Sequence, residues 1–107
     1  MNRDKNLPLT ETVYYILLAL YEPAHGYIIM QRVEELSGGQ VRLAAGTLYG
    51  AIENLLNKGL ITAIPSEDVR RKVYVISQLG KQVLTADYQR MTYMLGVTAN
   101  ILKEGAK

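Results

Sequence analysis

The sequence predicts a mainly α-helical chain of one domain, with a small β-hairpin and a long final helix. Apolar residues recur at helical spacing in three short segments before residue 60. Two alternating runs follow at residues 60–64 and 72–76, and helical spacing then returns over about residues 77–103. A length of 107 residues, with 49% hydrophobic and 21% charged residues, is typical of one ordinary globular domain.

The first two predicted helices lie on either side of a turn at His25-Gly26. The first begins near Thr10, a typical N-cap, and ends at Pro23. Its buried face consists of Val13, Ile16, Leu17 and Leu20. The second spans about residues 26–36 and is stopped by Gly38-Gly39. Its expected core residues are Ile29, Val33 and Leu36, and its expected solvent-facing residues are Gln31, Arg32, Glu34 and Glu35. At the junction, His25 is expected to form a structural hydrogen bond.

The remaining elements are a third helix, a hairpin and a long helix. The third helix covers about residues 45–58, with Gly59 as its stop and Leu48, Ile52 and Leu55 as its core face. Residues 65–71 form the charged turn between the two strands. Ser77 is the expected N-cap of the last helix, which at ~1.5 Å per residue forms a rod of roughly 40 Å.

Three short helices followed by a hairpin form the element order of a winged helix-turn-helix domain. The second and third helices are then the helix-turn-helix pair, and the hairpin is the wing. We therefore expect an N-terminal arm at residues 1–9, a DNA-binding domain at 10–77 and a C-terminal dimerisation helix at 78–107.

The exposed face of the third helix carries the first candidate DNA contacts. Hydroxyl groups of Thr47 and Tyr49 suit phosphate oxygens, and the amides of Asn54 and Asn57 each suit an adenine edge. Gly46 and Gly50 leave the backbone bare, which permits close approach. Asn57 shares this face, as does Glu53, whose charge counts against DNA. The alternative is an ordinary solvated helix face.

The wing carries the second group of candidate DNA contacts. Arg70, Arg71 and Lys72 are three consecutive cations, opposed by Glu67 and Asp68. A wing that lies along a DNA groove needs cations at this point, because they neutralise phosphates. The alternative is an ordinary charged hairpin tip.

The last helix carries a heptad-like apolar seam, which predicts a second copy of the chain as its partner. The expected dimerisation residues are Leu84, Tyr88, Met91, Leu95, Thr98 and Leu102. Tyr88, Met91 and Met94 are also candidates for lining an adaptable cavity that binds a small ligand, with plain packing as the alternative. A helix that folds back on its own core is the alternative to the homodimer.

Composition excludes several other functions. The absence of cysteine excludes a disulfide scaffold and a thiolate metal site, and one histidine excludes a site that needs two imidazoles. We expect no metal, no cofactor and no enzyme activity. The formal net charge of +2 neither demands nor excludes nucleic acid. No apolar stretch reaches about 18 residues, so we expect no membrane partner and a cytoplasmic protein.

Several blocks, in this order, resemble the PadR family of bacterial transcriptional regulators. They are His25-Gly26-Tyr27, the end of the second helix at residues 34–39, Gly46-Thr47-Leu48-Tyr49, Lys58-Gly59-Leu60-Ile61, and Arg71-Lys72-Val73-Tyr74 with Ser77 and Gly80. The resemblance covers roughly residues 13–80. It implies a homodimeric repressor that binds a double-stranded DNA operator and is released by a small aromatic or drug-like effector. It also places Gly46, Thr47, Tyr49, Arg71 and Lys72 at DNA.

The sequence departs from the family pattern at the third helix. Gly50 stands where the family usually has proline, Ala44-Ala45 replaces a serine-proline pair, and Asn54 replaces a basic residue. These departures leave a second hypothesis open: a dimeric ligand- or protein-binding module of the same fold with weak or no DNA binding.

Overall fold

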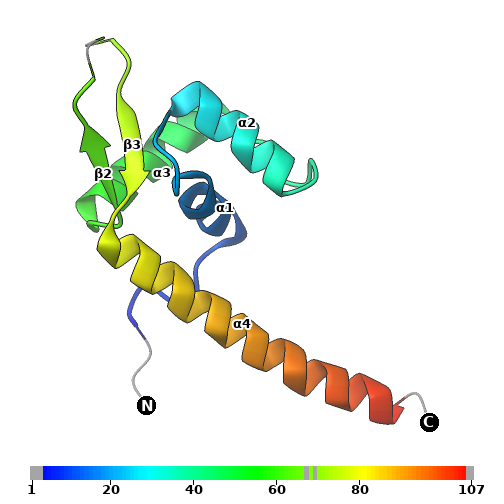
Figure 1. Ribbon diagram of the computed structural model, residues 1–107. Helices are drawn as coiled ribbons and strands as arrows, with labels where there is room; N and C mark the ends of the chain where they lie inside the picture. The colour runs from blue at the N-terminus through cyan, green and yellow to red at the C-terminus, as the bar shows by residue number, and fades with distance from the viewer. Residues whose placement is uncertain (1–3, 67, 69, 106–107) are drawn as a thin grey trace.

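The computed structural model describes residues 4–66, 68 and 70–105. Its elements are α1 (Glu11–Ala19), β1 (Ala24–His25), α2 (Gly26–Leu36), α3 (Ala45–Asn57), β2 (Ile61–Ile64), β3 (Val73–Ile76) and α4 (Gln78–Gly105). Helices α1 to α3 form a compact body beside the hairpin, and α4 runs away from that body (Figure 1). The molecule measures 60 × 32 × 21 Å, and α4 accounts for the long axis. The mainly α-helical winged helix-turn-helix fold is confirmed.

Two predicted helix caps are present. The Val13 amide donates a 3.1 Å hydrogen bond to Thr10 Oγ1 at the start of α1. At the start of α4, the Gly80 amide donates a 2.9 Å hydrogen bond to Ser77 Oγ. Ser77 Oγ also donates to the carbonyl of Gly59 at 2.6 Å, which ties α4 to the end of α3. Helix α1 ends at Ala19, before the proline at residue 23 that was expected to stop it.

The sheet has one strand more than the sequence predicts. Its order is β1-β3-β2, and both pairings are antiparallel. The additional strand, β1, is only two residues long, and it places Ala24 opposite Tyr74 and His25 opposite Val73. A strand this short shows no alternation, so its sequence carries no signal. Its pairing brings the start of α2 against the wing.

The core consists of the predicted apolar faces, with two corrections in α2. Leu36 was expected in the core but is 52% exposed, because it lies in the last turn of the helix beyond its neighbours. Arg32 was expected to face water, but its Nη1 donates to the carbonyls of Ala19 and Glu22, both at 2.9 Å. These carbonyls lie at and just beyond the end of α1, where helical hydrogen bonding runs out, so Arg32 binds α2 to α1. The core residues are Ile16, Leu17, Leu20, Ile29, Val33, Leu48, Ile52, Leu55, Leu60, Ile61, Tyr74, Ile76, Val83 and Leu84.

Only the first part of α4 packs against the body. Val83, Leu84 and Asp87 are buried there. The Asp87 carboxylate accepts hydrogen bonds from Arg90 Nε at 2.6 Å and from the Leu9 amide at 3.4 Å, which attaches the N-terminal arm. Residues 92–103 are all exposed in the single chain. Leu84, which the heptad pattern assigned to dimerisation, is 4% exposed and belongs to the core of its own chain.

Candidate nucleic-acid interface

The centre of the exposed face of α3 is a stripe of four residues that we call the reading stripe: Gly46, Gly50, Glu53 and Asn57. All four are exposed, and their spacing of four, three and four residues places them in line. No other group lies within 4 Å of the position that a Cβ atom would take at Gly46 or Gly50. The backbone is therefore uncovered at the two glycines, and Glu53 is the longest side chain of the stripe.

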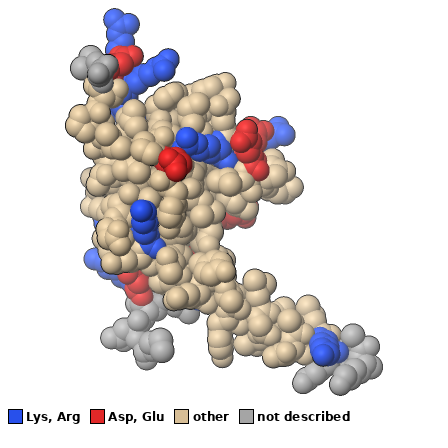
Figure 2. All heavy atoms as spheres, in the orientation of Figure 1, with Lys and Arg blue, Asp and Glu red and all other residues tan. Residues whose placement is uncertain are grey.

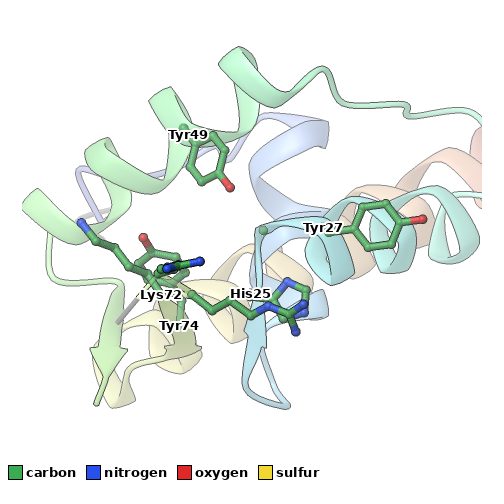
Figure 3. Close-up of a pocket in the computed structure, with 8 residues that line it drawn as sticks. His25, Tyr27, Tyr49, Lys72 and Tyr74 are labelled. Atoms are coloured by element: carbon green, nitrogen blue, oxygen red, sulfur yellow. The ribbon is translucent and has the colours of Figure 1, made fainter. Parts of the chain in front are cut away.

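A cleft of about 530 Å³ lies beside the reading stripe, between α3, the start of α2 and the wing. Tyr49 projects from α3 toward it, and Lys72, Tyr74 and His25 lie across from Tyr49 (Figure 3). Positive side chains gather at the wing end of the molecule (Figure 2). We call this feature the wing cleft; its lining residues are His25, Gly26, Tyr27, Tyr49, Arg70, Arg71, Lys72 and Tyr74.

The tyrosine of α3 packs directly on the first residue of α2. A Cβ atom at Gly26 would lie 2.6 Å from the hydroxyl of Tyr49 and 3.1 Å from its Cζ. Native Cβ atoms do not make contacts this short, so any other residue at position 26 would displace the Tyr49 ring from its present position. Two of the blocks that carry the family resemblance, at residues 25–27 and 46–49, thus meet at one contact in the wing cleft.

The buried tyrosine of the wing cleft has a perturbed hydroxyl. Tyr74 is 5% exposed, and burial, followed by the effect of Tyr49, raises its pKa above the ordinary value of 10.0. Like a tyrosine with the ordinary pKa, Tyr74 is protonated at physiological pH, and the raised pKa extends this neutral state to more alkaline pH. The protonated hydroxyl can donate a hydrogen bond to an anion, which a phenolate could not do.

Replacing Tyr74 by phenylalanine should reduce the loss of stability at alkaline pH. The folded chain holds the proton more tightly than the unfolded chain. The resulting stabilisation is therefore complete below about pH 10 and disappears as the pH rises through the folded pKa. We expect the Tm of the wild type, followed by circular dichroism, to fall more than that of Tyr74→Phe between roughly pH 9.5 and pH 11. Equal declines would contradict this assignment of the pKa.

The structure brings some of the predicted DNA contacts together and separates others. Tyr49 joins Arg70, Arg71 and Lys72 around the wing cleft. Asn54 instead lines a smaller groove of about 190 Å³ beside the N-terminal arm, on the other flank of α3, where Thr47 also lies. Asp68 is exposed, and its carboxylate accepts a 2.9 Å hydrogen bond from the Arg70 amide. Glu67, named as a second acidic neighbour, lies outside the described residues.

Sequence reasoning did not assign His25, Gly26, Tyr27 and Tyr74 to the site. His25 was expected to form a structural hydrogen bond; its backbone pairs in the sheet, but within the described residues its side chain does not cap α2. Residues 25–27 and 46–49 stand out as separate blocks of the sequence, but the contact between them depends on how the helices pack. The short pairing of β1 with β3 holds the residues just before Gly26 against the wing.

Apart from the buried Leu84, the candidate dimerisation and ligand residues lie on α4 beyond its buried contacts with the body. Tyr88, Leu95 and Leu102 are exposed, as is Met94, while Met91 is half-buried. Thr98 is exposed, and its hydroxyl donates a 2.7 Å hydrogen bond to the carbonyl of Met94 within the helix. Within the described part of the single chain, this apolar surface faces solvent.

The helix-turn-helix pair, the wing and the cationic cleft between them define a winged-helix protein with the framework of a transcriptional regulator. The sequence profile of the transcriptional regulator PadR-like family matches residues 14–86. The chain belongs to this family.

Proteins of known sequence or structure resemble this chain. An uncharacterised 37.1 kDa protein in transposon TN4556 of Streptomyces fradiae is 33% identical over 82 residues, which are 76% of this chain and 23% of that protein. The chain therefore spans less than a quarter of that relative. A PadR family transcription regulator from Clostridium difficile is 25% identical, with a TM-score of 0.67 over 84% of this chain and 97% of its own. H. salinarum RosR is 24% identical and has a TM-score of 0.71, and the match covers 95% of this chain and 97% of the RosR chain.

Across the described part of the chain, no helix combines the length and the apolarity that crossing a bilayer demands. Helix α4 is long enough at 28 residues, but polar and charged residues recur along its sequence between the positions of the apolar seam.

Proposed function

We propose that the chain is a homodimeric repressor that binds a double-stranded DNA operator through α3 and the wing. The observation that carries this proposal is the wing cleft, in which Arg70, Arg71 and Lys72 stand beside the exposed face of α3. A phosphate group in the cleft meets cations and tyrosine hydroxyls, and the reading stripe then faces the adjoining major groove.

The apolar seam of α4 supports the homodimer. Beyond the body of the molecule, large apolar side chains cover this helix on two adjacent stripes, which is unusual for a surface left in water. The heptad-like spacing of Tyr88, Met91, Leu95, Thr98 and Leu102 is typical of a helix that packs against a copy of itself. Two such chains place two α3 helices in successive grooves of a pseudo-palindromic operator, where they block transcription.

Release by a small aromatic or drug-like effector is part of the proposal. Tyr88, Met91 and Met94 lie on the same stretch of α4 that would form the dimer interface. A ligand held by these flexible and aromatic side chains changes the separation of the two α3 helices. The regulated DNA lies in the cytoplasm, so the protein acts there.

The test is fluorescence anisotropy with duplex DNA from the promoter of the protein's own operon. Arg71→Ala and Lys72→Ala should weaken binding to all sequences, and each should reduce the slope of log affinity against log salt by about 1, because one phosphate fewer is neutralised. Lys103→Ala, at the far end of α4, is the matched control and should change neither quantity. The proposal would be refuted if the wild type does not bind DNA at low salt. It would also be refuted if neither Arg71→Ala nor Lys72→Ala changes the affinity for DNA.

A second candidate, a dimeric ligand- or protein-binding module with weak or no DNA binding, is favoured by one observation. The only charged residue of α3 is the acidic Glu53. Without phosphate contacts, any binding of such a module to duplex DNA would show no slope of log affinity against log salt.

A further inference from the structure

We propose that Glu53 reads a cytosine in each half of the operator and thereby sets the sequence specificity of the regulator. This inference rests on the proposed DNA binding. It starts from a conflict on the reading stripe: the surface that would enter a groove of polyanionic DNA carries a carboxylate at its centre.

Among the described residues, no ion pair neutralises the charge of Glu53. Ion pairs in the described part of the chain join Arg42 to Glu34 and Arg90 to Asp87, and neither includes Glu53. Glu53 is exposed, and on the turns that precede it the stripe has only Gly50 and Gly46, which are surrounded by open space. The glycines allow the backbone to come close to the DNA, and Glu53, the longest side chain of the stripe, then extends toward the base edges.

The chemistry of the groove decides which base relieves the conflict. A carboxylate offers only hydrogen-bond acceptors. In the major groove, cytosine presents the N4 amino donor, whereas guanine presents the acceptors N7 and O6. Adenine presents a donor at N6 beside an acceptor at N7, and that acceptor repels the second carboxylate oxygen. At cytosine, the N4 amino group can donate a charge-assisted hydrogen bond to the Glu53 carboxylate. This bond offsets the electrostatic repulsion between Glu53 and the DNA phosphates.

The geometry separates this role from that of the wing. The cations lie in the wing cleft on the Tyr49 flank of α3, and they hold phosphates regardless of sequence. Affinity then comes mainly from the wing, and discrimination comes from Glu53. Because α3 has almost no positive charge to offset Glu53, DNA with a base that cannot donate a hydrogen bond to Glu53 should bind more weakly. The near absence of positive charge on α3 thereby favours specificity over affinity.

The test compares wild type, Glu53→Gln and Glu35→Gln in selection from a pool of random duplex DNA, followed by titration of single-base variants. Glutamine pairs with adenine through N6 and N7. Glu53→Gln should therefore change the preferred base at one position of each half-site from cytosine to adenine, a shift in relative affinity of about tenfold or more. Glu35→Gln removes an equal charge from the exposed end of α2 and should keep the cytosine preference.

Two results would overturn the inference. If Glu53→Gln strengthens binding to all sequences equally, Glu53 is only a repulsive charge; if it leaves the base preference unchanged, Glu53 does not reach the bases. Wild-type protein that binds no duplex at low salt would instead overturn the proposed function as a whole. Thermal melts of Glu53→Gln should match the wild type, since the residue is exposed.

Discussion

Replacing Gly80 by alanine should lower the free energy of unfolding by about 3 kcal/mol, although only one methyl group is added. The Cβ atom of that alanine would overlap the carbonyl oxygen of Leu60 and would lie 2.7 Å from Cγ1 of Ile76. Both neighbours belong to the segments that enter and leave the wing hairpin. The obstacle is backbone, which cannot rotate away as a side chain can, so α4 itself must move off the sheet.

The measurement is chemical denaturation of Gly80→Ala, with Gly46→Ala as the matched control. A Cβ atom at Gly46 meets nothing within 4 Å, so alanine there should raise stability by roughly 0.5–1 kcal/mol through helix propensity alone. The same chemical change is thus expected to have opposite signs at the two positions. Similar effects at both would show that α4 does not pack as closely on Leu60 as the structure indicates.

The hydrogen bonds around Ser77 explain why this junction is sensitive. Ser77 Oγ accepts from the Gly80 amide and donates to the Gly59 carbonyl, while the Ser77 amide donates to the Leu60 carbonyl at 3.0 Å. The end of α3, the start of β2 and the first turn of α4 are therefore joined through one serine. A shift of α4 breaks several of these bonds together and changes the direction in which the helix leaves the body.

The helices and the hairpin could be predicted from the sequence because their signals are local. Thr10 and Ser77 cap helices through residues three positions away, and the core face of α3 follows directly from helical spacing. The positive φ angles of Gly38 and Gly59, at 62° and 73°, are likewise set at the helix ends where glycine was expected.

The wing cleft could be predicted only in part, because it depends on contacts between distant segments. Residues 25–27 and 46–49 are each readable as motifs, but neither indicates that the Tyr49 hydroxyl rests on Gly26. The pairing of His25 with Val73 is carried by a strand of two residues, below the length at which a pattern exists. Similarly, the burial of Leu84 follows from where α4 leaves the body, which the heptad spacing does not reveal.

Replacing Leu95 by glutamate should convert a dimer into a monomer and reduce operator affinity by roughly 100-fold or more. Leu95 is 69% exposed in the single chain and lies in the middle of the apolar seam. In a homodimer two copies of the new carboxylate would face each other across an apolar interface, where neither can be solvated. The folded body should be unaffected, since residue 95 lies beyond the part of α4 that contacts it.

Mass measured in solution and anisotropy titration separate the effects on assembly and on binding. Wild type and the control Gln89→Glu, on the polar side of α4, should both have twice the 12.0 kDa mass of one chain. Leu95→Glu should have the mass of one chain, with an unchanged far-ultraviolet spectrum. Its affinity for the operator falls because each chain then engages one half-site alone and lacks the effective concentration that the second chain supplies. A wild-type monomer would contradict the homodimer, and a Leu95→Glu dimer would show that the interface does not depend on the apolar seam at Leu95.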